Sequence, residues 1–448
     1  MRWDLGELVE LLGSGEPPEN AALEITGVSI DSRSVKPGDL FVPIVAERDG
    51  HDFVGAAIDA GAVAYLRSTA DPVDPRVSSI AVDDTGAALM KLGAAARDRL
   101  EAHVVGVTGS VGKTSVKDLI GAVCEEHAVT HVSVASFNNE LGVPLTLLAA
   151  PDDAEVVVIE MGARDVGHIE LLCGIARPTV GVVTAVAAVH TEIFGSIEQV
   201  AAAKGELAEA LPTEGTLVLN ADDPVVADMV HRSGASEVVT YGATQRADVT
   251  FADVEVGADL RPTFTLSTPG GEARLTLGVA GAHMAQNAAA AAAVATVAGV
   301  PLEAILRGLA KPALSPHRMD VRITPSGATV IDDSYNANPT SMAAALDALS
   351  AVEAERRIAV LGVMAELGAT AADDHLAIIE RARAAGIQTI AVDAELYGPA
   401  AIHVHDVRSA VHAVGPLGHT DAVLVKGSRV AGLERVAEAL MAVESDLS

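Results

Sequence analysis

The stretch HVVGVTGSVGKTS, residues 103–115, decides the fold of this chain. Its first half is apolar and has the length of a buried strand, and its second half is a glycine-rich turn. A helix should follow the turn, because apolar residues then recur at helical spacing, at Val116, Leu119, Ile120 and Val123. A strand, a tight turn and a helix in this order are a building unit of parallel α/β sheets.

The turn has the composition of a phosphate-binding loop. Glycines let the backbone curl until several N–H groups point at one anion, and the helix N-terminus adds partial positive charge. Lys113 would reach the outer phosphates of a nucleotide, and the Thr114 hydroxyl suits Mg²⁺. Val107 stands where the common GxxxxGK[ST] pattern has its first glycine, but the strand–loop–helix context still favours phosphate binding over an ordinary turn. The residues predicted to bind the nucleotide here are Thr108, Gly109, Ser110, Gly112, Lys113, Thr114 and Ser115.

Outward from this unit, the chain continues to alternate strands and helices. Buried-strand runs follow at residues 156–159, 180–183 and 216–219, residues 248–277 alternate like antiparallel strands, and helical spacing returns at 282–309. Before the unit, strand-like runs and a helix at 85–100 occupy the first hundred residues, whose short strands are at 29–30, 39–45, 62–66 and 79–82. The segment MRWDLGELVELLG at the start has the pattern of an acidic amphipathic helix.

Pro312 and Pro316 indicate a linker, after which strands are expected at 358–361, 389–392 and 422–426 with helices between them. We therefore expect an α/β protein of three domains: 1–100, 101–312 and 313–448. The central domain should be a doubly wound, mostly parallel sheet with a small antiparallel part, and the last domain a second doubly wound α/β unit.

Composition narrows the class of function. Acidic residues outnumber basic ones by 61 to 30, a net charge of −31, which disfavours binding to nucleic acid or anionic lipid. A nucleotide site would need local cations, backbone N–H groups or a metal to reverse this field. Cys124 and Cys173 show no CxxC spacing and are expected to be reduced thiols. The longest apolar stretch, 288–300, is too short to span a bilayer, so we expect a cytoplasmic protein without membrane insertion.

The phosphate loop TGSVGKTS resembles that of the Mur ligases, a family that includes relatives of folylpolyglutamate synthetase. Further segments resemble this family in the same order along nearly the whole chain: DSRSVKPGDLF (31–41), DGHDF (49–53), NNELGVPLTLL (138–148), VIEMGARDVGHI (158–169), AAKGEL (202–207), GAHMAQNAAAA (281–291), HRMD (317–320), DDSYNANPTSM (332–342) and VKGSR (425–429). The resemblance implies a P-loop-type central domain, a Rossmann-like C-terminal domain, and an ATP-dependent ligase that works through an acyl-phosphate.

Within the family, DDSYNANP is similar to the members that add D-alanyl-D-alanine to UDP-N-acetylmuramoyl-tripeptide in peptidoglycan precursor synthesis, and differs from those that add a single amino acid. The resemblance thus implies these two substrates, ATP, Mg²⁺ in two sites, and a protein that we expect to be monomeric. Three alternatives remain: another Mur-family amide ligase (single amino acid or folyl-polyglutamate), a P-loop kinase or NTPase, and a non-catalytic nucleotide-binding module.

Candidate metal ligands follow from position and from the resemblance. Glu160 ends a buried strand, where doubly wound sheets bind ligands, and a carboxylate there suits Mg²⁺. Thr114 is the second candidate on chemical grounds. The resemblance adds His190 as a ligand of the second Mg²⁺, and Lys204 as a lysine carbamylated by CO₂ that holds the same ion. The alternatives are an ordinary loop histidine and a solvated helix lysine.

The resemblance also assigns the other predicted site residues. Asn287, four residues after His283 on one helix face, would contact the adenine region, Arg318 the phosphates and Asp333 the ribose. With Lys113, Lys204 and His190, Arg318 completes the predicted catalytic set. The substrate-binding residues would be Ser29, Asp31, Ser32 and Arg33 for the uridine nucleotide, Asn138, Asn139 and Thr146 near the cleft, and Asn336 and Asn338 for the dipeptide.

Three positions depart from the family pattern. Ala46 and His317 stand where a glycine is usual, and Val363 stands where an aspartate is usual. None of them belongs to the phosphate loop or to the predicted metal ligands.

Overall fold

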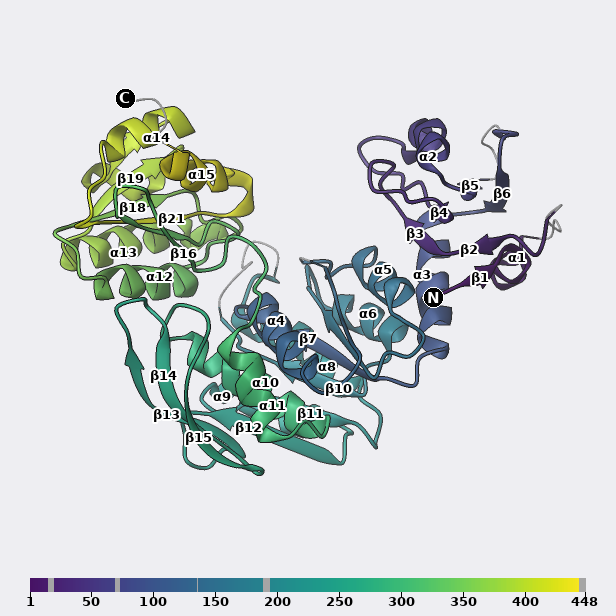
Figure 1. The fold of residues 1–448 in the computed structure, drawn as a ribbon, viewed down its shortest axis with the longest axis horizontal. Coiled ribbons are helices and arrows are strands. Elements are labelled where there is room, and N and C mark those ends of the chain that lie inside the picture. The colour runs from purple at the N-terminus through teal and green to yellow at the C-terminus, as the bar shows by residue number, and fades with distance from the viewer. Residues whose placement is uncertain (15–19, 69–72, 135, 188–193, 443–448) are drawn as a thin grey trace.

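The computed structural model describes residues 1–14, 20–68, 73–134, 136–187 and 194–442. The described residues form three sheets of four, nine and six strands and a two-stranded ribbon. In Figure 1 the small first sheet and the six-stranded third sheet lie at opposite ends above the large central one. Among these residues, no helix combines the length and the apolar character needed to cross a bilayer.

The central sheet has the order β15-β14-β13-β12-β11-β10-β7-β9-β8. Its strands are parallel from β8 to β13 and antiparallel from β13 to β15, as the sequence predicts. The strand bounds are β7 His103–Thr108, β8 Thr130–Val132, β9 Val156–Glu160, β10 Val180–Val183, β11 Thr216–Asn220, β12 Glu237–Gly242, β13 Val249–Val256, β14 Pro262–Thr268 and β15 Gly271–Thr276.

Helices cover both faces of this sheet, which is why its central parallel strands β7, β9 and β10 are mostly apolar. One face packs against α4 (Lys113–Cys124), α10 (Met284–Val297) and α11 (Leu302–Ala310). The other face packs against α5 (Gly142–Ala149), α6 (His168–Ala176) and α8 (Ile197–Glu209). Neighbouring residues of a strand point to opposite faces. In β7, Val104 packs on the side of α5, α6 and α8, and Val105 packs on the side of α4, α10 and α11. The short α9 (Pro224–Ala227) and η2 (Asp228–Arg232) follow β11.

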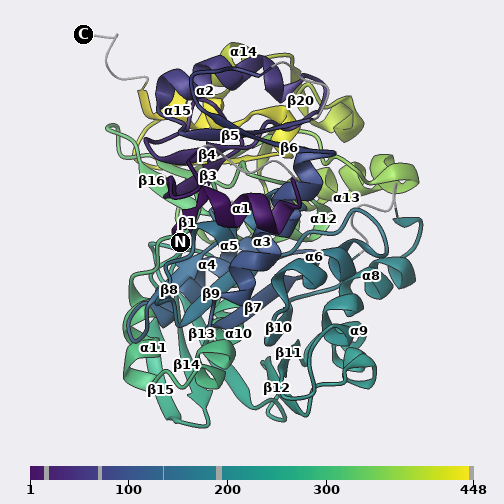
Figure 2. The same ribbon diagram turned by 90° about the vertical axis from the view of Figure 1, so that its right-hand side faces the viewer.

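The first sheet is small and parallel, with the order β3-β4-β5-β6, and is flanked by η1 and α2. Its helix α3 (Thr85–Asp98) packs against α5 and α6 of the central unit, so one hydrophobic core runs through both units, and Figure 2 shows this junction. The other bounds are β3 Gly27–Ser29, β4 Asp39–Phe41, η1 Gly50–Phe53, α2 Val54–Ala60, β5 Ala64–Ser68 and β6 Ser78–Val82.

Two local predictions in this unit are wrong at their edges. The N-terminal helix α1 covers only Leu5–Leu12, because Trp3–Asp4 form strand β1 and pair with β2 (Glu24–Ile25). The strand predicted at 39–45 ends at Phe41. Pro43 follows shortly, and proline has no N–H with which to continue a ladder.

The third sheet has the order β16-β17-β21-β18-β19-β20, parallel except for its antiparallel edge strand β16. Helices α12 and α13 cover one face and α14 and α15 the other, which makes it doubly wound. The bounds are β16 Asp320–Ile323, β17 Thr329–Asp332, α12 Pro339–Ala351, β18 Arg356–Leu361, η3 Gly368–Thr370, α13 Ala371–Ala384, β19 Gln388–Val392, η4 Glu395–Ala400, β20 Ile402–Val404, α14 Val407–Val414, β21 Asp421–Lys426, η5 Arg429–Ala431 and α15 Glu434–Ala442.

Candidate active site

A cavity of about 670 Å³ opens between the central and third units. Both units line it, and it contains the N-terminus of α4, the end of β9, the start of α10 and the segment between β17 and α12. The predicted residues that it brings together are Ser110, Gly112, Lys113, Thr114, Ser115, Asn138, Asn139, Glu160, Lys204, Asn287, Arg318, Asp333, Asn336 and Asn338.

The phosphate loop between β7 and α4 depends on two glycines in the left-handed region. Gly109 has φ 143°, and a Cβ there would lie 2.0 Å from Thr184 Oγ1. Gly112 has φ 84° and directly precedes α4, with Asn287 of α10 beside it. Lys113 donates through Nζ to the Gly109 carbonyl at 2.7 Å, so the lysine closes the loop on itself. Burial lowers the pKa of Lys113.

Thr108 and Gly109 do not line the cavity, although both were predicted to bind the nucleotide. The Thr108 hydroxyl donates to the Met161 carbonyl at 2.9 Å inside the sheet, so it fixes the strand that carries the loop. Thr146 also lies outside the cavity, because its hydroxyl donates to the Gly142 carbonyl within α5 at 2.9 Å.

Glu160 and Thr114 form a pair of hard oxygen donors. The Thr114 hydroxyl donates to Glu160 Oε2 at 2.6 Å, and the Asn138 amide donates to Glu160 Oε1 at 2.7 Å. Glu160 is buried, and no cation of the described residues lies within ion-pair distance of it. Mg²⁺ takes one or two protein oxygens and keeps its remaining waters, so this pair fits the ion.

The second predicted metal site is only partly within the described residues. His190 lies outside them. Among the described residues, no group of three His, Cys, Asp or Glu side chains is placed to hold a metal ion. The remaining candidate ligands are therefore Glu160, Thr114 and the modified form of Lys204.

Lys204 on α8 is 2% exposed, so the alternative of a solvated helix lysine is wrong. Burial, and next the charge of Lys113, lowers the pKa of Lys204 to about 7. Its Nζ lies 5.9 Å from the centroid of the Phe194 ring. An amine with this pKa is about half neutral at pH 7, and the neutral amine is the form that reacts with CO₂.

Arg318 reaches from the third unit to the phosphate loop. Its Nη2 donates to Thr114 Oγ1 at 2.8 Å, and its buried Nε has no hydrogen-bond partner among the described residues. The residues on either side, His317 and Met319, have φ 62° and 48°. A guanidinium with a spare, buried donor beside a phosphate loop fits an anionic oxygen.

His317 departs from the family's glycine and still takes the left-handed conformation that glycine favours. Three contacts hold it there. Its Nδ1 lies 2.8 Å from Asp332 Oδ2, its carbonyl accepts from Tyr335 N–H at 3.1 Å, and the next residue but one, Met319, donates its N–H to Asp333 Oδ1 at 3.1 Å. At the other departures the backbone is paired: Ala46 N–H donates to Arg48 and Val363 C=O accepts from Ser428.

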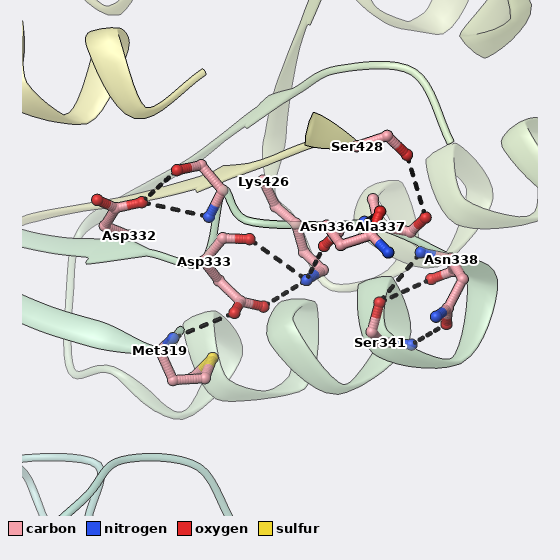
Figure 3. Close-up of polar contacts among 10 residues, drawn as sticks. Met319, Asp332, Asp333, Asn336, Ala337, Asn338, Ser341, Lys426 and Ser428 are labelled. Carbon is pink, nitrogen blue, oxygen red and sulfur yellow. Dashed lines mark hydrogen bonds and ion pairs between the residues drawn. The ribbon is translucent and has the colours of Figure 1, made fainter. Parts of the chain in front are cut away.

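Figure 3 shows the third-unit side of the cavity. The buried Lys426 donates through Nζ to the Asp333 carboxylate and, at 2.9 Å, to the Asn336 carbonyl. Asn338 caps α12, because its Oδ1 accepts from Ser341 N–H at 2.9 Å while Ser341 Oγ accepts from Asn338 N–H. These contacts fix the loop that carries three predicted ligand-binding residues.

Sequence reasoning missed Tyr335, Lys426 and Ser136 as residues of the cavity. Tyr335 and Lys426 lie inside the segments DDSYNANPTSM and VKGSR, so their position in these motifs was an available signal. Nothing in the sequence singles out Ser136, whose hydroxyl is hydrogen-bonded to the Tyr335 hydroxyl across the two units.

The predicted uridine-binding residues lie in the first unit and do not line this cavity. The exposed Arg33 pairs with Asp31 at 2.6 Å, and its hydrogen bonds lower the pKa of Asp31 to about 2. Ser29 is buried and donates to the Asp31 carbonyl at 2.9 Å, which shapes the turn that also contains Ser32.

Family comparisons cover the whole of this architecture. The chain matches the Mur ligase family catalytic domain over residues 24–100, the Mur ligase middle domain over 107–295 and the Mur ligase glutamate ligase domain over 317–429. UDP-N-acetylmuramoyl-tripeptide--D-alanyl-D-alanine ligase of Mycobacterium tuberculosis (strain CDC 1551 / Oshkosh) is 38% identical over 98% of this chain and 97% of its own. The Escherichia coli (strain K12) ligase of the same name is 35% identical over 97% and 98%.

Solved structures agree in fold. A crystal structure of MurF from Acinetobacter baumannii has a TM-score of 0.86 at 28% identity and covers 99% of each chain. A MurF ligase from Thermotoga maritima in complex with ADP has a TM-score of 0.80 at 26% identity, covering 93% of this chain and 97% of its own. With relatives of this identity aligned over nearly its full length, the chain belongs to the Mur ligase family.

Proposed function

We propose that this protein is the ATP-dependent ligase that joins D-alanyl-D-alanine to the C-terminal carboxylate of UDP-N-acetylmuramoyl-tripeptide in peptidoglycan precursor synthesis. The observation that carries the proposal is the cavity, where the phosphate loop of the central unit faces the DDSYNANP segment of the third. Full-length relatives named for this reaction, and a neighbour solved with ADP, support it.

The chemistry would proceed in two steps. A carboxylate oxygen of the tripeptide attacks the γ-phosphorus of ATP, ADP leaves, and an acyl-phosphate results. The dipeptide amine then attacks the acyl carbon, and phosphate leaves as the amide forms. Such a phosphoryl transfer needs positioning and charge neutralisation more than covalent help from the protein.

Each requirement has a residue in the cavity. The loop N–H groups at the start of α4 and Lys113 would hold the phosphates, and the free donor of Arg318 would bind a transferring oxygen. Thr114 and Glu160 would hold Mg²⁺, which supplies positive charge where negative charge builds up. Closure of the third unit on the central one would exclude water from the acyl-phosphate.

We further propose that Lys204 is carbamylated and, with His190, holds a second Mg²⁺. Its burial beside the phosphate loop and its lowered pKa support this modification, because an unmodified ammonium would repel the ion. Asn287 beside Gly112, and Asp333 in the third unit, would contact the nucleoside of ATP.

The three units divide the substrates in this proposal. Residues 1–100 would bind the UDP part through Ser29, Asp31, Ser32 and Arg33, residues 101–312 the ATP, and residues 313–448 the dipeptide through Asn336 and Asn338. Asn138 and Asn139 would face the tripeptide carboxylate, and Thr146 would support the helix α5 that follows them. We expect a cytoplasmic monomer that binds neither nucleic acid nor membrane.

The test is phosphate release from ATP with UDP-N-acetylmuramoyl-tripeptide, with and without D-alanyl-D-alanine. We expect turnover only when both are present, and little with single amino acids or folate substrates. Efficient turnover with a single amino acid would assign another ligase of the family. ADP release that needs neither acceptor nor UDP substrate would identify an NTPase instead.

A further inference from the structure

Arg318 is the cation of the third unit that reaches the phosphate loop, and its aim depends on its surroundings. An arginine side chain is long and loses much rotamer freedom when it is held in one place. In this structure the guanidinium is already held with Nη2 on Thr114 and with a buried Nε that has no partner among the described residues. Since no phosphate is needed to hold the guanidinium here, contacts within the protein, besides that with Thr114, must fix its position.

Tyr335 supplies that support from two sides. Its ring lies under the guanidinium, with Arg318 Cζ 4.3 Å from the ring centroid. Its backbone N–H donates at 3.1 Å to the carbonyl of His317, the left-handed residue that directs Arg318 toward the central unit. One residue thus fixes both the backbone and the side-chain plane of the arginine.

The Tyr335 hydroxyl makes a separate contact with the central unit. It is hydrogen-bonded to Ser136 Oγ, and both residues line the cavity. Arg429, at 5.9 Å from the ring centroid, is the more distant second cation on this ring. The tyrosine therefore lies where the two units meet. Its ring stacks on the Arg318 guanidinium, and its hydroxyl bonds to Ser136 of the central unit.

We propose that Tyr335 is a positioning residue for the ligase reaction. Its ring orients Arg318 toward the transferring phosphoryl group, and its hydrogen bond to Ser136 sets the closed position of the third unit. The inference deepens the proposed function and rests on it. The ring and the hydroxyl act separately, so substitutions can separate them.

The experiment compares Tyr335→Leu, Tyr335→Phe and Ser136→Ala in steady-state kinetics, each variant first checked for folding by its thermal unfolding. Loss of the ring should lower kcat about 10- to 100-fold, since a cation–π contact and a misplaced catalytic group each cost on this scale. The KM for the UDP-tripeptide should stay within about twofold of wild type. Tyr335→Phe keeps the ring and should retain kcat within about threefold.

The hydroxyl is tested by pairing variants. Ser136→Ala and Tyr335→Phe should have equal effects, and the double variant should be no worse than either, because each removes the same bond. In an Arg318→Lys background, Tyr335→Leu should add little, since the group that the ring orients has gone. Should Tyr335→Leu fail to fold, Tyr335→His takes its place. Histidine keeps a smaller ring, so the kcat of this variant should lie between that of wild type and that expected for Tyr335→Leu.

Two results would overturn the inference. One is an unchanged kcat in folded Tyr335→Leu. The other is an equal loss in the leucine and phenylalanine variants that appears in the KM for the dipeptide, which would make the hydroxyl a substrate contact. The proposed function is judged separately, by whether the wild-type enzyme needs D-alanyl-D-alanine for turnover.

Discussion

Lys204 illustrates how burial changes the chemistry of a single residue. An exposed lysine has a pKa of about 10, so at neutral pH almost none of it is in the neutral form that reacts with CO₂. At 2% exposure and next to the charge of Lys113, the pKa of Lys204 falls to about 7. Its position at the cavity then suits the proposed carbamate, which would replace a cation with an anion at the proposed second metal site.

Replacement of Lys204 by alanine should therefore lower kcat by a factor of about 100 to 1,000, the usual effect of losing an electrostatic stabiliser in a closed site. The helix should remain folded, and a short carboxylic acid added in solution should restore part of the rate by occupying the space of the carbamate. The exposed helix residue Lys91 gives the matched control, Lys91→Ala, which should be close to wild type. Wild-type rates in Lys204→Ala would refute the carbamate.

His317 shows a second residue-scale effect, in which a side chain offsets the strain of its own backbone. A non-glycine residue in the left-handed region costs about 1–2 kcal/mol, and the bond to Asp332 compensates for it. Asp332 also accepts from Arg322 at 2.7 Å, so this carboxylate keeps a partner when the histidine is removed.

We expect His317→Ala to lower the free energy of unfolding by about 1–2 kcal/mol, since alanine keeps the strain and loses the bond. His317→Gly should be the more stable variant by about 1 kcal/mol, because glycine adopts this φ without strain. Urea denaturation of the two variants decides the matter. If the free energy of unfolding of His317→Ala equals or exceeds that of His317→Gly, the histidine does not offset backbone strain.

At the scale of elements, His375 on α13 fixes the loop that follows β18. Its Nε2 accepts from Met364 N–H at 3.0 Å, and its Nδ1 donates to the Ala371 carbonyl at 2.6 Å. The ring packs edge-on against Tyr397, 4.7 Å between centroids. Only the neutral ring can make both bonds, and burial lowers the pKa of His375. The loop in turn carries Glu366 into the cavity.

The pH dependence follows from the sign of this shift. As the pH falls, the unfolded chain, whose histidine pKa is about 6.5, binds a proton at a higher pH than the folded protein does. Stability should therefore fall as pH decreases below about 6.5 and continue to fall until the lowered pKa of the folded state is reached. His375→Gln can make both bonds without titrating, so stability should fall less steeply in this variant as the pH decreases. An equally steep fall in the variant, measured by urea denaturation at pH 5–7, would exclude His375 as the source.

The accuracy of prediction from sequence also varied by element. The unit β7–turn–α4 was predicted because its signals are local: an apolar run, glycines in the turn and a helical repeat. Strands β16 and β17 were not predicted. They have four residues each, and β17 lies beside β21, about ninety residues away in the chain. Such pairing depends on contacts between segments distant in the chain, which no local sequence pattern records.

For the candidate site too, residues placed by local signals could be predicted from the sequence, whereas contacts between distant segments could not. Glu160 is the last residue of β9, and Lys113 and Thr114 begin helix α4, after the turn that follows β7. Parallel strands bring these ends together at one edge of the sheet. The contacts of Tyr335 with Ser136 and of Arg318 with Thr114 join segments about two hundred residues apart. They depend on how two units are set against each other, so only the folded structure contains them.

For the whole molecule, the dominant feature is its excess of negative charge. If each of the 30 basic residues were paired with one acidic residue, 31 of the 61 acidic residues would still lack a basic partner. Many of the pairs that do form are exposed, such as Arg381 with Asp347, and exposed pairs contribute about 0–1 kcal/mol each. Self-repulsion across the three units should therefore outweigh the attraction within surface pairs.

Added salt tests this balance. Repulsion among separated charges is long-range and is screened as the Debye length falls from about 30 Å at 0.01 M to about 10 Å at 0.1 M, whereas pairs in direct contact are screened less. We expect the calorimetric Tm to rise by several degrees, roughly 3–8 °C, between 0.01 and 0.3 M NaCl, equivalent to about 1–3 kcal/mol for a unit of roughly 150–250 residues. An uncharged osmolyte at equal osmolality serves as the control for general solvent effects and should lack the steep rise at low concentration. A Tm that falls as NaCl is added would mean that paired charges, and not the surplus of acidic ones, govern the electrostatics of the fold.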